Sequence, residues 1–339
     1  MSKSRRLCAL LVAAALVLSA ALTARSVTDD EHHPSRVRRA AVGVPPGAVP
    51  RLAFVSQDVG YALYGCGGEQ CPAPLFGTVD GGATWRRLAH PATGRVSLYA
   101  SPRALVLWWS ARDVSLMSTD RGVTWTEVER SLAPYRGIRG FFQAEDSGGL
   151  VSWRDGLPVR VPERPPLPFV SAVATGADGR VWVACLLSGG VRAAVSVDGG
   201  ETWAVTPVVP QGGWPVSLSL RVSADGRNVW LLGHPSDPAA FPLLWTMVAG
   251  RWLPVAAAGH PHVFDSAVPV AGGLVVSGAA GSGLIAGGRY LPLRGWPPSD
   301  SGLYLLEDGT VFTQAGAVGW LGVGFGVDRR WTRIELRPA

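Results

Sequence analysis

From residue 49 onward the chain alternates short apolar segments with polar turns rich in glycine and aspartate. The pattern of apolar run, turn and second apolar run recurs in 51–65, 170–186, 219–233, 265–279 and 302–316. Short runs of alternating or continuous apolar residues are typical of half-buried β-strands. No stretch of 49–339 repeats its apolar residues at helical spacing, so we predict an all-β domain there.

Three segments, 78–85, 118–125 and 196–203, follow one pattern, [ST]-x-D-x-G-x-T-W. Asp and Gly reverse the chain between two strands, because the carboxylate can accept backbone N–H groups and glycine tolerates a positive φ. The tryptophan then packs on its neighbours. A carboxylate that holds its own turn is poorly placed for catalysis or metal binding. We therefore predict a structural role for Asp80, Gly82, Trp85, Asp120, Gly122, Trp125, Asp198, Gly200 and Trp203.

These segments resemble the Asp-box, or bacterial neuraminidase repeat, of sialidases, sortilin-type receptors and propellers similar to photosystem II assembly factors. The resemblance implies a β-propeller. Degenerate hairpins at 153–159, 245–252, 284–290 and 327–331 fill the gaps, and the last keeps Asp328 and Trp331. The turns recur about every 35–50 residues, which is the length of a four-stranded blade.

We predict a seven-bladed β-propeller over 49–339. The expected blades are 51–89, 95–129, 137–162, 169–208, 216–256, 263–294 and 301–337. The third is short enough to hold only three strands, and treating it as an insertion gives the alternative of six blades.

The first 24 residues have the form of a secretory signal. Lys3, Arg5 and Arg6 precede an apolar run over 7–24, which ends in Leu22-Thr23-Ala24. The run is also long enough for an uncleaved membrane anchor. We expect a signal peptide or anchor over 1–24, a linker over 25–48, and a secreted or cell-envelope protein that meets a membrane only through an uncleaved N-terminal segment.

The formal net charge of +6 first suggests a nucleic-acid partner. Residues 1–24 carry three basic residues and no acidic ones, however, and residues 49–339 carry 24 arginines against 22 acidic residues. Their signs are interspersed, as on an ordinary solvated surface. We expect no nucleic-acid binding.

The cysteines fit an exported protein. Cys66 and Cys71 are close in sequence and we predict a small disulfide loop, because no further soft ligands lie nearby to complete a metal site. Cys185, in an apolar run, is expected to be a buried free thiol. We expect no cofactor.

In a propeller the loops between the second and third strands, and between blades, share the face that usually binds ligands. Here these loops are 66–74, 163–169, 206–215, 233–242, 257–262 and 294–300, rich in Pro, Gly and Trp. Candidate binding residues are Trp214, His234, His260, His262 and Trp296. The three histidines could instead bind zinc, although exposed loop histidines are the simpler interpretation.

A sialidase would need three arginines around the substrate carboxylate, a Tyr–Glu nucleophile pair and an acidic acid/base. The early Phe/Tyr-Arg-Ile-Pro motif of that family is absent, with Pro50-Arg51-Leu52 as its nearest echo, and the full set cannot be assembled. We therefore predict a monomeric, non-enzymatic binding or interaction module for a glycan or protein ligand. A sialidase-like glycoside hydrolase and an assembly factor for a membrane complex are the alternatives.

Overall fold

A computed structural model describes residues 35–44, 47–65, 68, 71–128, 141–143, 150–154, 157–161, 163–278, 281–300 and 302–339. These residues belong to one compact unit, Pro34–Ala339. The described part is all-β, with no helix, and its strands form seven sheets.

Six sheets have four or five strands and one has three, and in the four-stranded sheets consecutive strands pair antiparallel. The first two sheets hold β2 (Pro50–Phe54), β3 (Gly60–Tyr64), β4 (Leu75–Thr78), β5 (Arg86–Leu88), β6 (Val96–Ala100), β7 (Leu105–Trp109), β8 (Val114–Ser118) and β9 (Thr126–Val128). The third and fourth hold β10 (Phe141–Gln143), β11 (Leu150–Arg154), β12 (Leu157–Arg160), β13 (Ala172–Thr175), β14 (Val181–Leu187), β15 (Gly190–Ser196) and β16 (Ala204–Thr206).

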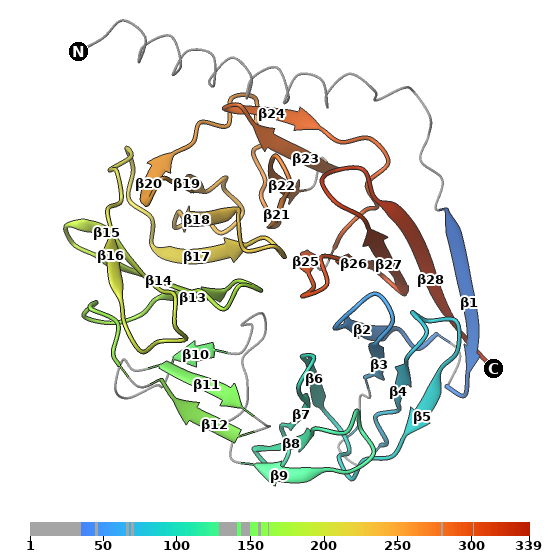
Figure 1. Cartoon of the computed structure of the whole chain (residues 1–339). Coiled ribbons are helices and arrows are strands. Elements are labelled where there is room, and N and C mark those ends of the chain that lie inside the picture. The colour runs from blue at the N-terminus through green and yellow to red at the C-terminus, as the bar shows by residue number, and fades with distance from the viewer. Residues whose placement is uncertain are drawn as a thin grey trace, which may run out of the picture. The chain divides into compact units, whose positions relative to one another are not determined.

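The fifth and sixth sheets hold β17 (Ser217–Val222), β18 (Val229–His234), β19 (Leu243–Val248), β20 (Arg251–Pro254), β21 (Ser266–Val270), β22 (Gly273–Gly278), β23 (Gly281–Ala286) and β24 (Arg289–Pro292). The seventh holds β25 (Leu303–Leu305), β26 (Val311–Ala315), β27 (Val318–Val323), β28 (Arg330–Pro338) and, from the other end of the chain, β1 (Arg36–Val42). Within residues 34–339 the sheets are arranged around a ring, with the first strands of the sheets toward its middle (Figure 1). Seven sheets in this arrangement fit the predicted blade boundaries.

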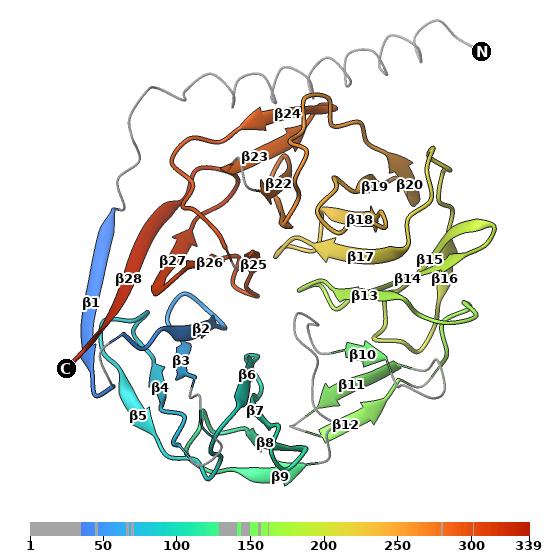
Figure 2. The same ribbon diagram turned by 180° about the vertical axis from the view of Figure 1, so that it is seen from behind.

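Strand β1 corrects the expected linker over 25–48. It pairs in parallel with β28, from Arg36 opposite Thr332 to Val42 opposite Pro338. Figure 2 shows β1 along the outer side of β28. Three arginines make the segment look like a solvated linker, and a pairing between the two ends of the chain leaves no local sequence signal. The N-terminal strand thereby joins the last sheet.

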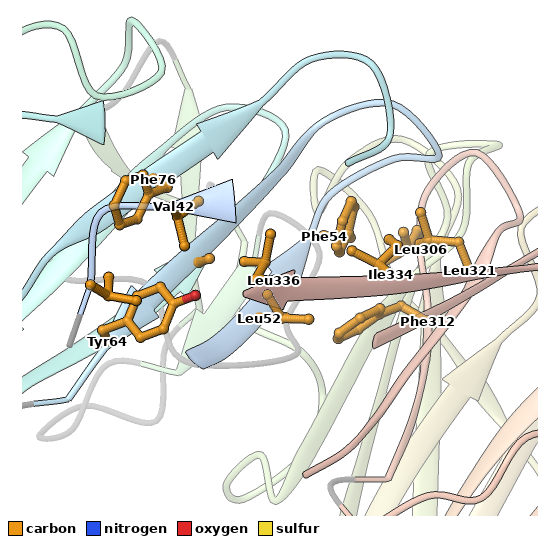
Figure 3. Close-up of a cluster of buried hydrophobic side chains, with 12 residues drawn as sticks. Val42, Leu52, Phe54, Tyr64, Phe76, Leu306, Phe312, Leu321, Ile334 and Leu336 are labelled. Carbon is orange, nitrogen blue, oxygen red and sulfur yellow. The ribbon is translucent and has the colours of Figure 1, made fainter. Parts of the chain in front are cut away.

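The junction between the last and first sheets has an apolar core that includes a buried polar bridge. Leu52 and Phe54 from β2 pack against Phe312 and Ile334 of the last sheet, and Val42 of β1 belongs to the same cluster (Figure 3). The buried side chain of Gln314 accepts a hydrogen bond from the Leu52 N–H at 3.0 Å. It also donates to the Pro50 carbonyl at 2.7 Å. Such full pairing of a buried amide favours one register between the two sheets.

Similar clusters join the first sheet to the second, the third to the fourth, and each later sheet to the next. Apart from the second and third sheets, each sheet supplies apolar side chains to both neighbours, as the alternation within its strands requires. Residues 129–140, between the second and third sheets, lie outside the described residues.

Candidate functional site

The three repeated turns are closed by their own aspartates. In the first, the Asp80 carboxylate accepts hydrogen bonds from the N–H groups of Ala83 and Thr84, both at 2.9 Å, and from the Thr84 hydroxyl at 2.6 Å. The Thr78 hydroxyl donates to Asp80 at 2.8 Å and accepts the Gly82 N–H at 2.9 Å. Every oxygen of this carboxylate is therefore used inside the turn.

Asp120 and Asp198 repeat this arrangement, with serine replacing the first threonine. Hydrogen bonds from Thr124 and from Thr202 hold the pKa of these two carboxyls well below their usual range. Burial opposes the shift at Asp80, but the hydrogen bonds from Thr84 and Thr78 prevail and lower its pKa to about 2. All three remain ionised and occupied, so none is available as an acid or base near neutral pH.

In each turn the glycine at the fifth position of the motif touches the preceding sheet. Gly82, Gly122 and Gly200 have φ of 90°, 86° and 99°. A Cβ atom on Gly200 would lie 2.1 Å from Val161 Cγ1, and one on Gly122 would lie 2.8 Å from Leu88 Cδ1. Glycine is needed there both for the backbone and for the close approach.

The tryptophans of these turns are half-buried and also contact the preceding sheet. The indole N–H of Trp125 donates to the Ala89 carbonyl at 2.9 Å, and that of Trp203 donates to the Glu163 carbonyl at 3.0 Å. Trp85 instead donates to Gly82 within its own turn at 3.1 Å. The contacts of Trp125 and Trp203 therefore fasten one sheet to the next, whereas that of Trp85 closes its own turn.

The fourth, degenerate turn between β27 and β28 is built differently. No hydrogen bond to the Asp328 carboxylate is present among the described residues. Instead, the buried Arg329 donates to the carbonyls of Gly309 at 2.8 Å and Gly322 at 3.0 Å. Burial lowers the pKa of Arg329 to about 10, with Asp308 opposing the shift. Trp331 is buried nearby and packs edge-on against Trp296, with ring centroids 5.2 Å apart.

A cavity of about 900 Å³ lies between the first strands of four consecutive sheets. Strands β13, β17, β21 and β25 line it, together with loop residues that include Pro238, Phe264, Asp265 and Asp300. These loops connect second to third strands or one sheet to the next. The lining loops therefore lie on the face that the sequence indicated for binding, and Pro238 and Asp300 fall within the predicted loops 233–242 and 294–300.

Arg221 is the cavity's main polar feature. Its side chain projects from β17, where Nε donates to the Ala267 carbonyl of β21 at 3.3 Å and Nη1 donates to the Leu220 carbonyl at 3.0 Å. No ion pair to Arg221 occurs among the described residues. A guanidinium has five N–H donors, so several of them remain for water or a ligand in the cavity.

Burial lowers the pKa of Arg221, and the neighbouring Tyr304 opposes this shift. Arginine nevertheless keeps its charge at neutral pH. The site thus holds a positive charge in a partly desolvated position without a carboxylate against it. Such a charge is costly unless an anion or water compensates it.

Ser219 lies two residues before Arg221 on the same face of β17, and its hydroxyl is 2.8 Å from His234 Nε2. Burial, followed by the charge of Arg221, lowers the pKa of His234 and favours its neutral form. Asp265 and Asp300 supply carboxylates from the loops, and Asp300 accepts the Gly316 N–H at 2.8 Å. The cavity therefore offers a cationic group among its strands and acidic groups near its loops.

The five candidate loop residues do not line this cavity. Trp214 is exposed, His260 stacks on Phe241 with ring centroids 4.1 Å apart, and Trp296 donates its indole N–H to Val327 at 3.1 Å. His262 is exposed, and His234 reaches the cavity only through Ser219. Sequence reasoning missed Arg221 and Ser219, although their alternation with buried Leu218 and Leu220 places both on the opposite face of the strand.

Within the described residues no three His, Cys, Asp or Glu side chains come together as a metal site. Cys185 is buried and free, as predicted. Cys66 lies outside the described residues, so its disulfide with Cys71 stays a prediction. No helix in the described part of the chain could span a membrane.

The sialidase constellation is not assembled in the cavity from the described residues. Its lining has one arginine, one tyrosine and two aspartates, and no glutamate. A clamp of three arginines beside a Tyr–Glu pair, which the enzyme hypothesis requires, is therefore not formed by these residues.

No protein-family model matches this sequence, and neither does any curated protein. Solved structures that resemble the fold are β-propellers. They include YCF48 bound to D1 peptide, at 14% identity and a TM-score of 0.45, covering 81% of this chain and 91% of that one. KlHsv2 with loop 6CD replaced by a Gly-Ser linker matches at 8% identity and 0.48, covering 83% and 95%. Apo AztD from Citrobacter koseri matches at 10% identity and 0.42, covering 86% of each chain. With these scores, the likenesses say nothing about function.

Proposed function

We propose that the protein is an exported, monomeric, seven-bladed β-propeller of the Asp-box class that binds a segment of a partner protein in its central cavity. The observation that carries the ligand assignment is Arg221, a cationic side chain in the cavity with unused N–H donors and no ion pair among the described residues. The three repeated turns support the class, because each aspartate holds its turn as the motif implies.

The cavity chemistry favours an acidic side chain or a carboxylate as the group held by Arg221. A guanidinium binds a carboxylate with two parallel hydrogen bonds, and in a partly desolvated site such bonds are stronger than in water. Ser219 of β17 and Ser266 of β21 add hydroxyl groups to the lining, while Asp265 and Asp300 suit N–H groups of a peptide. A peptide provides both kinds of group within one short segment.

An array of immobilised peptides tests this proposal. Peptides containing Asp or Glu are compared with the same sequences in which Asn or Gln replaces them. The wild-type protein should select acidic peptides. The affinity of Arg221→Met for those peptides should be lower by about tenfold to 100-fold, which is the loss expected for a charge-assisted hydrogen bond. Arg251→Met, an exposed arginine on β20 of the same sheet, is the matched control and should bind as wild type does.

Equal binding of acidic and amide peptides by wild type would contradict the proposal. So would undiminished binding by Arg221→Met. A sialic-acid glycoside assay on the wild type separates the enzyme alternative, since turnover there would replace the binding assignment.

The export part of the proposal rests on residues 1–24. Cell fractionation with an antibody to the C-terminal region should place the protein outside the cytoplasm, and deleting 1–24 should keep it inside. Cytoplasmic location of the intact chain would overturn this part alone and leave the cavity assignment in place.

A further inference from the structure

One part of the outer rim concentrates positive charge. Eight arginines lie in three strands, β1, β28 and β5, which together contain a single acidic residue, Glu335. The rest of residues 34–339 carries 19 arginines against 21 acidic residues. The basic character of the fold is therefore concentrated in these three strands.

The three strands are neighbours in the fold. β1 and β28 are paired, and the Arg38 guanidinium donates to the Asp80 carbonyl in the turn that leads into β5. β1 forms the edge of the last sheet and β5 the edge of the first (Figure 1). We call this surface the basic rim; its arginines are Arg36, Arg38, Arg39, Arg86, Arg87, Arg330, Arg333 and Arg337.

Glu335 neutralises only part of this charge. It pairs with Arg39 at 3.1 Å, with Arg333 at 3.0 Å and with Arg337 at 2.9 Å. Burial opposes ionisation of Glu335, but the hydrogen bonds from Arg337 and Arg39 prevail and lower its pKa. Three arginines thus share one carboxylate. Arg36, Arg86, Arg87 and Arg330 are exposed at the same rim.

The basic rim is close in the chain to the apolar run over 7–24, and this closeness favours a membrane as its partner. The apolar run ends at Ala24 and β1 begins at Arg36. Even fully extended, the residues between them span only about 40 Å. Whenever the run is in a membrane, as an anchor or before cleavage, β1 is the part of the sheet structure nearest to it along the chain. Clusters of several Lys or Arg residues beside a membrane segment bind anionic headgroups.

We propose that the basic rim is a docking surface for an anionic membrane, which orients the ring with β1 and β28 toward the lipid headgroups. The inference is independent of the cavity ligand. It assigns the arginines of β1 a role beyond protecting an edge strand from pairing with another chain, which is the purely structural use of such charges.

The test uses the chain from Arg25 onward, because the described contacts all lie within the compact unit Pro34–Ala339. Circular dichroism and thermal melting first show that each variant is folded. Binding is then measured by flotation with vesicles of phosphatidylcholine alone and with vesicles that also contain phosphatidylglycerol. We expect binding only to the anionic vesicles, weakened at high salt by screening.

The decisive comparison uses two triple variants of equal net charge. Arg36→Gln, Arg86→Gln and Arg330→Gln remove exposed rim charges, whereas Arg192→Gln, Arg251→Gln and Arg289→Gln remove exposed charges from other sheets. Each rim arginine near the surface contributes about fivefold, so the rim variant should bind roughly 100-fold more weakly. The control variant should bind within about twofold of wild type.

Three outcomes overturn the proposal. One is no preference for phosphatidylglycerol, and another is an equal loss in both triple variants, which would reflect net charge alone. The third is a rim variant that self-associates in sedimentation while its vesicle binding is unchanged, which would leave edge protection as the role. The first outcome includes the case in which the rim binds an acidic protein but does not bind vesicles.

Discussion

The turns between third and fourth strands and the central cavity use polar side chains in opposite ways. In the turns, Asp80, Asp120 and Asp198 spend their carboxylate oxygens on groups a few residues away. In the cavity, Arg221 keeps N–H donors in excess of its internal partners. Polar groups satisfied within the protein stabilise it, while unsatisfied ones at a cavity are available to a ligand. Substitutions in the turns should therefore change stability, and those in the cavity should change binding.

The largest loss of stability should come from Arg329→Met. The change removes two charge-assisted hydrogen bonds, to the carbonyls of Gly309 and Gly322. It also removes the attraction between the guanidinium and the carboxylate of Asp308, for which Arg221 has no counterpart among the described residues. The free energy of unfolding should therefore fall by about 2–4 kcal/mol. Denaturant unfolding measures this loss. Peptide binding by the folded variant should be unchanged. A variant that is as stable as wild type but no longer binds peptides would place Arg329 with the binding groups instead of the structural ones.

Gly200→Ala should follow, with a loss of about 2–3 kcal/mol, because the new methyl group overlaps Val161 and the backbone is left-handed. Gly199→Ala is the matched control. Its φ is also positive, at 74°, but no atom lies within 4 Å of the added Cβ. It should lose only about 1 kcal/mol. Thermal and denaturant unfolding measure both losses. If the two variants lose equal stability, the close contact with Val161 is unimportant.

Acid should weaken the turns in a defined window. The pKa values of Asp80, Asp120 and Asp198 are lowered in the folded chain, so their contribution to stability is present above the unfolded value near 3.8 and is lost as the pH falls through the folded value, about 2 for Asp80. Unfolding midpoints measured across this range should fall with pH. The triple Asp→Asn variant should show a flatter dependence, and an identical slope would remove the carboxylates as its cause.

Arg221→Met should have the smallest effect on stability. An apolar side chain avoids the desolvation cost of the charge, which offsets the two lost hydrogen bonds, so the free energy of unfolding should change by less than about 1 kcal/mol. The same variant is expected to lose the selected acidic peptides. A loss of stability as large as that of Arg329→Met would place Arg221 with the structural groups and end the contrast between the two regions.

The sequence by itself determined the strands and their grouping. Period-two apolar segments separated by glycine-rich turns predict the seven sheets nearly to their boundaries, because strand alternation and turn chemistry are local. The [ST]-x-D-x-G-x-T-W motif likewise indicated which aspartates close their own turns, since all the groups involved lie within a few residues. It did not indicate that Gly200 approaches Val161, which follows the last strand of another sheet.

Only the tertiary structure decided the pairing of β1 with β28 and the position of Arg221. Both depend on segments far apart in the chain: β1 is completed by the C-terminal strand, and Arg221 lines a cavity that exists only where four sheets meet. Alternation could place Arg221 and Ser219 on one face of β17, but not show what that face meets. Local rules fix each strand and turn, whereas a cavity and a charged rim arise from the packing of distant ones.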